Sequence, residues 1–364
     1  MKKTKGILLI LVLAIALLAG CSVHDGTNKD PVTDSTESAV SGTTIRVGTM
    51  PVTVGSSLDY AMKQGWFEEA GINVERILFA TGAPINEALS AQQIDISISG
   101  PASIYAVASG DITWIGDINT STGSGIYVRP DSPVLNDKGN IADAPEMYGS
   151  AETLKGLTII GPLGTTSQFN AVAWMDRFGL TANDYSMLSM DFGPATQAFL
   201  TGEGDAVAVP PPYTVQLEEA GYVCAATLED AANTILCDGI GVRTAYLEEN
   251  RETVVEFMKI LYRAQEVLAN DDAVAADLCF EFYNENGREY SEADIQSELD
   301  VRDWVDEEYM EADDYVFGQW LVELGEFYVN DGKILPEDFP NIRAGLDASI
   351  IEEVYGFSLN LPPE

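Results

Sequence analysis

The residues best suited to ligand chemistry in this 364-residue chain are small hydroxyl, amide and glycine residues where helical patterns begin. One set comprises Gly164, Thr165, Thr166, Ser167 and Gln168. The first backbone N–H groups of a helix have no partner within it, and the helix dipole adds positive potential, so this segment can bind an anionic oxygen. The structural alternative is ordinary N-capping by Thr165 or Thr166.

A similar loop precedes a helical pattern at Gly100, Ala102 and Ser103, where Ser103 supplies a hydroxyl donor. Capping and ligand contact can coexist there. The weaker candidates have different structural alternatives to ligand binding. Asn119 and Thr122 could orient a polar ligand or form an Asx turn, Tyr213 could cover an alkyl body or remain in the core, and Thr53 is chosen only for its position in a loop.

Candidates for acid–base or metal chemistry are scarce. The only histidine, His24, lies near the N-terminus, and the sequence has no P-loop and no dinucleotide-binding glycine pattern. Asp95 and Asp205 could be a carboxylate pair, but each opens a buried strand pattern, which favours structural hydrogen bonding. We therefore expect no catalytic residue, no metal site and no cofactor.

Two copies of one pattern organise the chain, at residues 82–103 and 192–212. A shift of 110 positions superposes Asp95 on Asp205 and Pro101 on Pro211. In each copy a helix is followed by a short apolar run that reads as a strand buried on both faces. Ligands bind beyond the carboxyl ends of such strands, so a duplicated lobe predicts two sets of loops that face one crevice.

The first twenty residues have the features of an export signal. Three lysines precede an uncharged apolar stretch too short for a mature membrane-spanning helix. The string LLAGC ends at Cys21 and resembles the lipobox of bacterial lipoproteins, in which the cysteine is lipidated. An ordinary export signal is the alternative. Residues 22–43 are polar and read as a flexible tether.

The formal net charge is −39, which makes nucleic acid and anionic lipid poor partners. Acidic residues are spread along helical segments, so a solvated surface is favoured over a cation site. Of the remaining cysteines, Cys224 and Cys237 could close a short disulfide in an exported protein, which leaves Cys279 unpaired. The sequence leaves that disulfide open.

Alternating strand and helix patterns predict an α/β protein with two lobes, each a mostly parallel sheet flanked by helices. The expected divisions are a first lobe over residues 44–130, a surface excursion over 131–153, a second lobe over 154–235, and a return to the first lobe over 236–364. The return ends in helices that we expect to serve only packing.

The strings RVGTMP from Arg46, KQGWFEEAGINVE from Lys63, ALSAQQIDISISGPAS from Ala88 and LKGLTIIGPLGTTSQ from Leu154 occur in an order that resembles one family. They look like the solute-binding proteins of ABC importers for taurine, alkanesulfonates and nitrate, which share the periplasmic-binding-protein type II fold. That resemblance implies a monomeric receptor that passes a small solute to a permease and its ATPase. It also favours ligand binding over capping at Thr165 and Thr166.

The ligand is less determined than the fold. Neutral donors favour an organosulfonate or a nitrate-like anion, whereas a neutral heteroaromatic such as a thiamine-type pyrimidine precursor is the alternative. The cysteine-rich motif of pyrimidine-binding relatives is missing.

An exported enzyme on the same scaffold and a sensor or adhesion lipoprotein are the alternatives from other classes. The only cations expected near the site are Arg129 and Lys155. The expected location is the outer face of a bacterial cytoplasmic membrane, anchored by lipid.

Overall fold

The computed structural model describes residues 43–120 and 122–363. The predicted export signal, the lipidation site at Cys21, most of the tether and His24 lie outside these residues. Among the described residues, no helix combines the length and apolarity that a membrane crossing requires.

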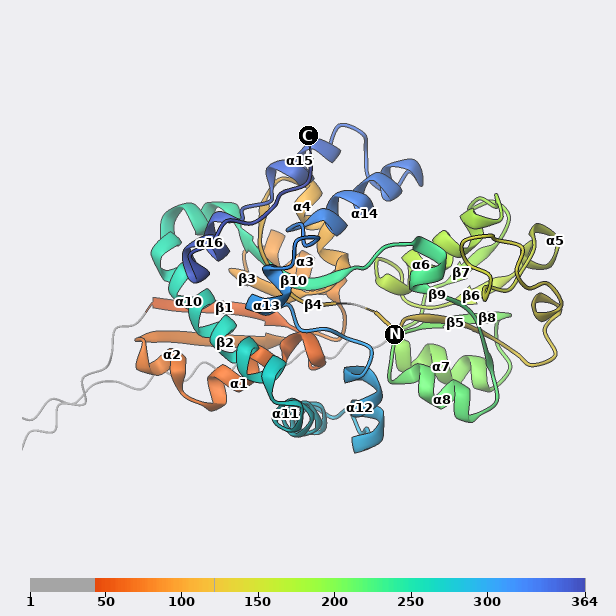
Figure 1. Ribbon diagram of the computed structural model, residues 1–364, viewed down its shortest axis with the longest axis horizontal. Coiled ribbons are helices and arrows are strands. Elements are labelled where there is room, and N and C mark those ends of the chain that lie inside the picture. Colours follow the sequence, from red (N-terminus) through yellow and green to blue (C-terminus); the bar gives the residue numbers. More distant parts are fainter. Residues whose placement is uncertain (1–42, 121, 364) are drawn as a thin grey trace, which may run out of the picture. The chain divides into compact units, whose positions relative to one another are not determined.

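The first sheet contains five strands, of which four run in one direction (Figure 1). In spatial order they are β2 (Ile72–Leu78), β1 (Thr43–Thr49), β3 (Ile96–Ser99), β10 (Cys237–Arg243) and β4 (Ile112–Thr120). Only β10 is antiparallel to its neighbours. The strand β3 is buried along its whole length, as its unbroken run of small and apolar residues predicts.

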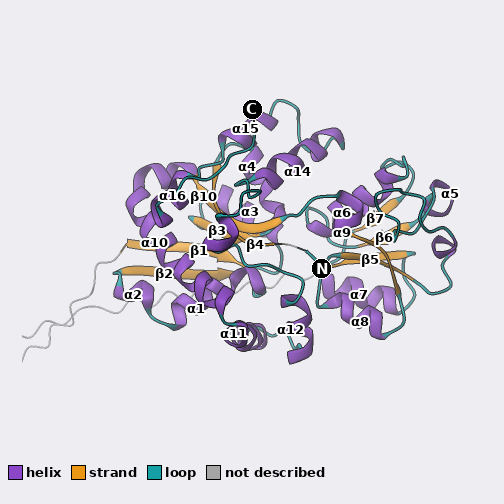
Figure 2. Ribbon diagram, in the orientation of Figure 1, coloured by secondary structure: helices purple, strands orange, loops and turns teal. Residues whose placement is uncertain are grey.

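The second sheet repeats this plan. Its order is β7 (Ser186–Leu188), β6 (Thr158–Ile160), β8 (Ala206–Val209), β5 (Gly125–Val128) and β9 (Val223–Thr227). Here β5 is the single antiparallel strand. The prediction of two mostly parallel sheets flanked by helices is therefore confirmed, and Figure 2 shows the helices on the faces of both sheets.

The duplication is visible in the element boundaries. Helix α3 (Gly82–Ser90) and helix α7 (Phe192–Leu200) start 110 positions apart, as do strands β3 and β8. Each helix packs against the strand that follows it.

The remaining helices surround the two sheets. They are η1 (Thr53–Gly55), α1 (Ser56–Lys63), α2 (Trp66–Glu69), η2 (Pro101–Ser103), α4 (Ile104–Ala108), η3 (Pro133–Asn136), α5 (Ala151–Leu154), α6 (Thr166–Arg177), α8 (Tyr213–Glu219), α9 (Leu228–Ala232), α10 (Thr244–Asn270), α11 (Asp272–Glu285), α12 (Glu292–Leu299), α13 (Glu307–Met310), α14 (Gln319–Asn330), α15 (Phe339–Ala344) and α16 (Ser349–Tyr355). Helices α1 and α2 are separate because Gly65 between them adopts a positive φ of 72°.

The chain crosses from the first sheet to the second between Thr120 and Gly125, and returns through α9 to β10. The expected first lobe extended to residue 130. Strand pairing instead places β5 in the second sheet. The first crossing is thus earlier and shorter than the sequence pattern suggested, because β5 and β4 are both buried along their whole length and only their partners distinguish them.

The expected surface excursion over residues 131–153 contributes to the core of the second sheet. Val134, Ala144 and Met147 are almost completely buried in that core. Trp174 Nε1 donates a hydrogen bond of 2.9 Å to the carbonyl oxygen of Tyr148. The segment lacks helical or strand periodicity because isolated side chains anchor it, so its sequence alone resembled a surface loop.

The cysteines of the described residues are all free. Cys224 lies in β9 of the second sheet, and Cys237 lies in β10 of the first. The sequence did not decide whether Cys224 and Cys237 form a disulfide, and in the structure they do not. Burial raises the pKa of Cys224 to about 11, so its thiol stays protonated at neutral pH.

Candidate functional site

A cleft lies where strand ends and helix starts from both sheets converge, and about 840 Å³ of space, part of it open to solvent, lies within it. The two copies of the repeated pattern contribute equivalent residues to this cleft. Gly82 and Phe192 are 110 positions apart and begin α3 and α7. Pro101 and Pro211, which follow β3 and β8, are a second such pair. The duplicated pattern in the sequence therefore marks both walls of one cavity.

Of the sequence-predicted ligand residues, six line the cleft: Gly100, Ala102, Thr122, Thr165, Thr166 and Tyr213. The other six do not: Thr53, Ser103, Asn119, Gly164, Ser167 and Gln168. Contacts within the protein explain where such side chains lie. Ser103, for example, is buried and its hydroxyl lies 2.8 Å from the hydroxyl of Ser99.

At the start of α6, which borders the cleft, the first backbone N–H groups of the helix are available to a ligand. Thr165 is the N-cap residue, but its hydroxyl donates to the carbonyl oxygen of Pro162 at 2.8 Å and does not cap the helix. Gln168 instead stabilises the preceding loop, because its Oε1 accepts the N–H of Gly164 at 2.7 Å. The side chain of Ser167 is fully buried. The capping alternative thus fails for Thr165, and α6 directs its positive end toward the cleft.

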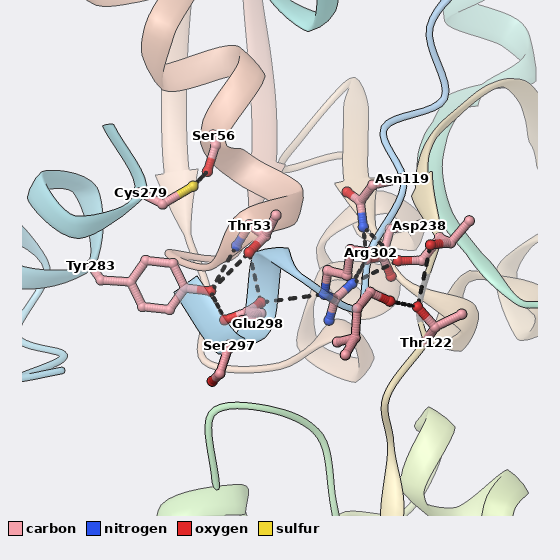
Figure 3. Close-up of polar contacts among 12 residues, drawn as sticks. Thr53, Ser56, Asn119, Thr122, Asp238, Cys279, Tyr283, Ser297, Glu298 and Arg302 are labelled. Atoms are coloured by element: carbon pink, nitrogen blue, oxygen red, sulfur yellow. Dashed lines mark hydrogen bonds and ion pairs between the residues drawn. The ribbon is translucent and has the colours of Figure 1, made fainter. Parts of the chain in front are cut away.

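Glu298 of α12 lies at the cleft wall and is almost completely buried. Its Oε1 accepts the hydroxyl of Thr53 at 2.6 Å, and its Oε2 accepts the hydroxyl of Tyr283 at 2.6 Å (Figure 3). The N–H of Thr53 also donates to the Tyr283 oxygen at 2.9 Å. Burial strongly raises the pKa of Tyr283, and the nearby Glu298 charge adds to that effect, so the phenol remains a donor. Thr53 therefore positions a lining residue without lining the cleft itself.

Arg302 and Asp238 form an ion pair beside this group. Arg302 Nη1 lies 2.9 Å from Asp238 Oδ2, and Arg302 Nε lies 3.4 Å from a Glu298 oxygen. Asn119 Nδ2 donates to the same Asp238 oxygen at 2.8 Å. Burial alone would lower the pKa of Arg302, but the charges of Asp238 and Glu298 raise it above its ordinary value. The guanidinium therefore stays charged.

Aromatic rings form another part of the wall. Tyr213 of α8 stacks on Phe192 of α7, with ring centroids 5.9 Å apart. Tyr213 also meets Tyr290 edge to face at 5.9 Å, and Tyr290 meets Tyr283 at 5.7 Å. Because Tyr213 follows β8 of the second sheet and Tyr283 belongs to the C-terminal helices, these rings join the two sides of the cleft. Such a surface suits the apolar body of a small solute.

Sequence reasoning missed the charged residues of the cleft. Arg288 and Arg302 line it, whereas the expected cations lie elsewhere. Arg129 donates to backbone carbonyls, including that of Gly204 at 2.6 Å, and Lys155 pairs with Asp184 at 3.0 Å. The C-terminal helices were expected only to pack, yet α11, α12 and the segments beside them supply Tyr283, Arg288, Tyr290, Glu298 and Arg302. The available signal was weak: one Asp, at 238, in a strand whose other residues are small or apolar as far as Val242.

Comparison with known proteins agrees with this architecture. Residues 38–280 match the model of the NMT1-like family. A protein of Brachyspira hyodysenteriae provisionally named an ABC transporter periplasmic binding protein is 30% identical over 99% of this chain and 100% of its own length. A Bacillus subtilis protein provisionally named an aliphatic sulfonates-binding protein is 28% identical over 71% of this chain and 72% of its own.

Solved structures share the fold. The alkanesulfonate-binding protein SsuA of Xanthomonas axonopodis pv. citri, bound to MOPS, has a TM-score of 0.63 and 18% identity, and the match covers 84% of this chain and 98% of SsuA. The periplasmic nitrate-binding protein NrtA of Synechocystis PCC 6803 has a TM-score of 0.64 and 14% identity, with 87% and 89% covered. At these identities the likeness shows the fold alone.

Proposed function

Because the chain belongs to the NMT1-like family, we propose that it is the solute-binding subunit of an ABC importer, a monomer that captures a small solute and delivers it to a permease. The observation that carries this proposal is the cleft, which is lined by duplicated helix starts from both sheets. The relatives named above are binding proteins, which supports a receptor in place of an enzyme.

The solute class that this site suits best carries an anionic oxygen, such as an organosulfonate. The positive end of α6 faces the cleft without a capping side chain at Thr165. Arg288 also lines the cleft, and no ion pair to it is found among the described residues. The sulfonate named for the Bacillus subtilis relative supports the same class.

The location that goes with this role is outside the cytoplasmic membrane. The relative from Brachyspira hyodysenteriae is named a periplasmic binding protein, which supports export. Attachment by a lipid on Cys21 is the finer proposal, and it depends on the lipobox-like string LLAGC.

The experiment is a thermal-shift screen of residues 22–364 against methanesulfonate, benzenesulfonate, taurine and nitrate. Ligand that binds the native state raises Tm by mass action, so at least one oxyanion should produce a shift. Thr165→Asp should abolish it, because Asp is a good N-cap and preserves α6 while it places a negative charge where the oxyanion would bind. Ser132→Asp adds the same charge at the N-cap of η3, away from the residues that line the cleft, and should leave the shift unchanged.

Small-angle scattering tests the receptor mechanism independently of ligand identity. Two sheets joined by two crossings should close on a bound solute, which lowers the radius of gyration. An unchanged radius at a saturating concentration of a shifting ligand would contradict the receptor proposal.

A further inference from the structure

Asp238 uses only one of its two carboxylate oxygens within the protein. Oδ2 accepts from Asn119 Nδ2 at 2.8 Å and from Arg302 Nη1 at 2.9 Å. Oδ1 receives no hydrogen bond from the described residues. The residue is only 6% exposed and lines the cleft. Oδ1 is therefore the carboxylate oxygen that remains available to a solute in the cleft.

The backbone of Gly100 makes room for that oxygen. A Cβ atom at position 100 would lie 2.6 Å from Asp238 Oδ1. Gly100 lines the same cleft at the end of β3. The absent side chain therefore leaves Oδ1 accessible from the cavity.

Arg302 has an unused donor beside this acceptor. Nη1 donates to Asp238 Oδ2 and to the carbonyl oxygen of Thr120, and Nε faces Glu298. Nη2 makes no hydrogen bond to the described residues. Figure 3 shows the guanidinium between Glu298 and Asp238, with one terminal nitrogen that carries no contact. A donor and an acceptor thus stand next to each other on one wall.

The charge of this wall selects against a second anion. Two carboxylates, Asp238 and Glu298, surround one guanidinium, so the group is negative by one charge. An additional carboxylate or sulfonate at this position would be repelled in a poorly solvated environment. A neutral group with an N–H donor and a carbonyl acceptor would satisfy both free atoms without such repulsion.

We propose that Asp238 Oδ1 and Arg302 Nη2 recognise an uncharged carboxamide-like group on the solute, one that donates to the carboxylate and accepts from the guanidinium. This inference rests on the proposed function, because it assigns a second polar group to the solute that carries the anionic oxygen. The aromatic rings of Tyr283 and Tyr290 line the cavity nearby and suit a flat body between the two polar ends.

The test compares three benzenesulfonates that differ only at the para position, by calorimetric titration of residues 22–364. The 4-carbamoyl compound donates and accepts, the 4-acetyl compound only accepts, and the 4-carboxy compound adds a charge. We expect the 4-carbamoyl compound to bind about 10- to 100-fold more tightly than the 4-acetyl compound, since the 4-acetyl compound would cover the Oδ1 acceptor without offering it a donor. The 4-carboxy compound should bind most weakly.

Asp238→Asn gives a second, directional measurement. The Asn oxygen must face Arg302 and Asn119, so its NH2 group replaces the free acceptor with a donor. The preference should then reverse toward the 4-acetyl compound. Asp205→Asn, at an exposed residue directly before β8, should leave the wild-type preference intact.

Equal affinities for the 4-carbamoyl and 4-acetyl compounds in the wild-type protein would overturn this inference and leave the receptor function standing. The wild-type comparison decides this even where Asp238→Asn fails to fold. Absence of binding by all three compounds would also overturn it, while the oxyanion screen and the scattering experiment decide the proposed function separately.

Discussion

Asp95 and Asp205, which are 110 positions apart, form equivalent hydrogen bonds in the two sheets. Asp95 Oδ2 accepts the N–H of Arg46 at 3.0 Å, and Asp205 Oδ2 accepts the N–H of Thr158 at 2.8 Å. Each aspartate N–H donates back to the carbonyl of the same partner at 2.8 Å. In each sheet the aspartate thus links its own strand to the parallel strand beside it. The expected structural role of both residues is thereby confirmed.

Asp95→Asn should destabilise the protein more than Asp205→Asn. Asp95 is buried and pairs with Arg46 and Arg243, each at 2.6 Å, whereas Asp205 is exposed and forms no such pair with any residue that the structure describes. We expect a loss of about 2–4 kcal/mol for Asp95→Asn, below the full cost of a buried broken pair because the Arg46 side chain is 35% exposed. Asp205→Asn should cost about 1 kcal/mol or less. Urea unfolding measures both, and equal losses would contradict the difference.

The same site predicts a dependence of stability on pH. Burial alone would raise the pKa of Asp95, but hydrogen bonds from Arg46 and Arg243 lower it below the ordinary 3.8. The unfolded chain therefore binds this proton first as the pH falls. The stabilisation is fully present above about pH 5 and is lost as the pH drops through 4 and below. The free energy of unfolding of Asp95→Asn should fall less steeply than that of the wild type between pH 5 and 3.

Thr53→Val should weaken the support of Glu298. The substitution keeps the shape of the side chain but removes the hydroxyl that donates to Glu298 Oε1. A hydrogen bond to a buried charge contributes about 1.5–3 kcal/mol, so we expect a loss of that size in denaturant unfolding. Thr44→Val removes an exposed hydroxyl that accepts from Asn73 and serves as the control. A loss no larger than that of the control would show that Glu298 does not depend on Thr53.

Gly100→Ala should reduce solute affinity at least tenfold, because the new Cβ displaces Asp238 Oδ1 from its place in the cleft. It should also destabilise the fold by about 1–3 kcal/mol through overpacking. Gly193→Ala is the matched control, since a Cβ there meets its nearest atom at an ordinary 3.8 Å. Calorimetric titration with a benzenesulfonate that shifts Tm measures the affinities. Wild-type affinity in Gly100→Ala would rule out the expected displacement.

Cys21→Ala should abolish membrane attachment without a change in the folded domain. Two or more acyl chains hold a lipoprotein stably, and this variant offers no thiol to receive them. In a detergent phase separation the wild type should enter the detergent phase and the processed variant the aqueous phase. Otherwise the variant should accumulate as a precursor whose signal is not cleaved. A Cys21→Ala protein that is processed and still partitions into detergent would refute the lipobox interpretation. Cys224→Ala, in the second sheet, is the control.

Local patterns in the sequence determined the repeated framework. The helix and strand of each copy were predicted because burial on both faces leaves an unbroken apolar run, and because glycine and proline mark the turns. The strand β8 lies within the second copy of the pattern, at residues 192–212, and α8 begins directly after it at Tyr213. The loops that line the cleft were found for the same reason, since they follow these strands directly.

The sequence by itself thus determined the α/β class, the duplication and the helix starts that face the cleft. Only the tertiary structure decided which charges enter it. Asp238, Glu298 and Arg302 lie on a strand, a helix and the segment after that helix, and Asn119 and Thr53 come from still earlier parts of the chain. The physical reason is that local periodicity records whether a side chain is buried, whereas an ion pair depends on which distant segments fold against each other.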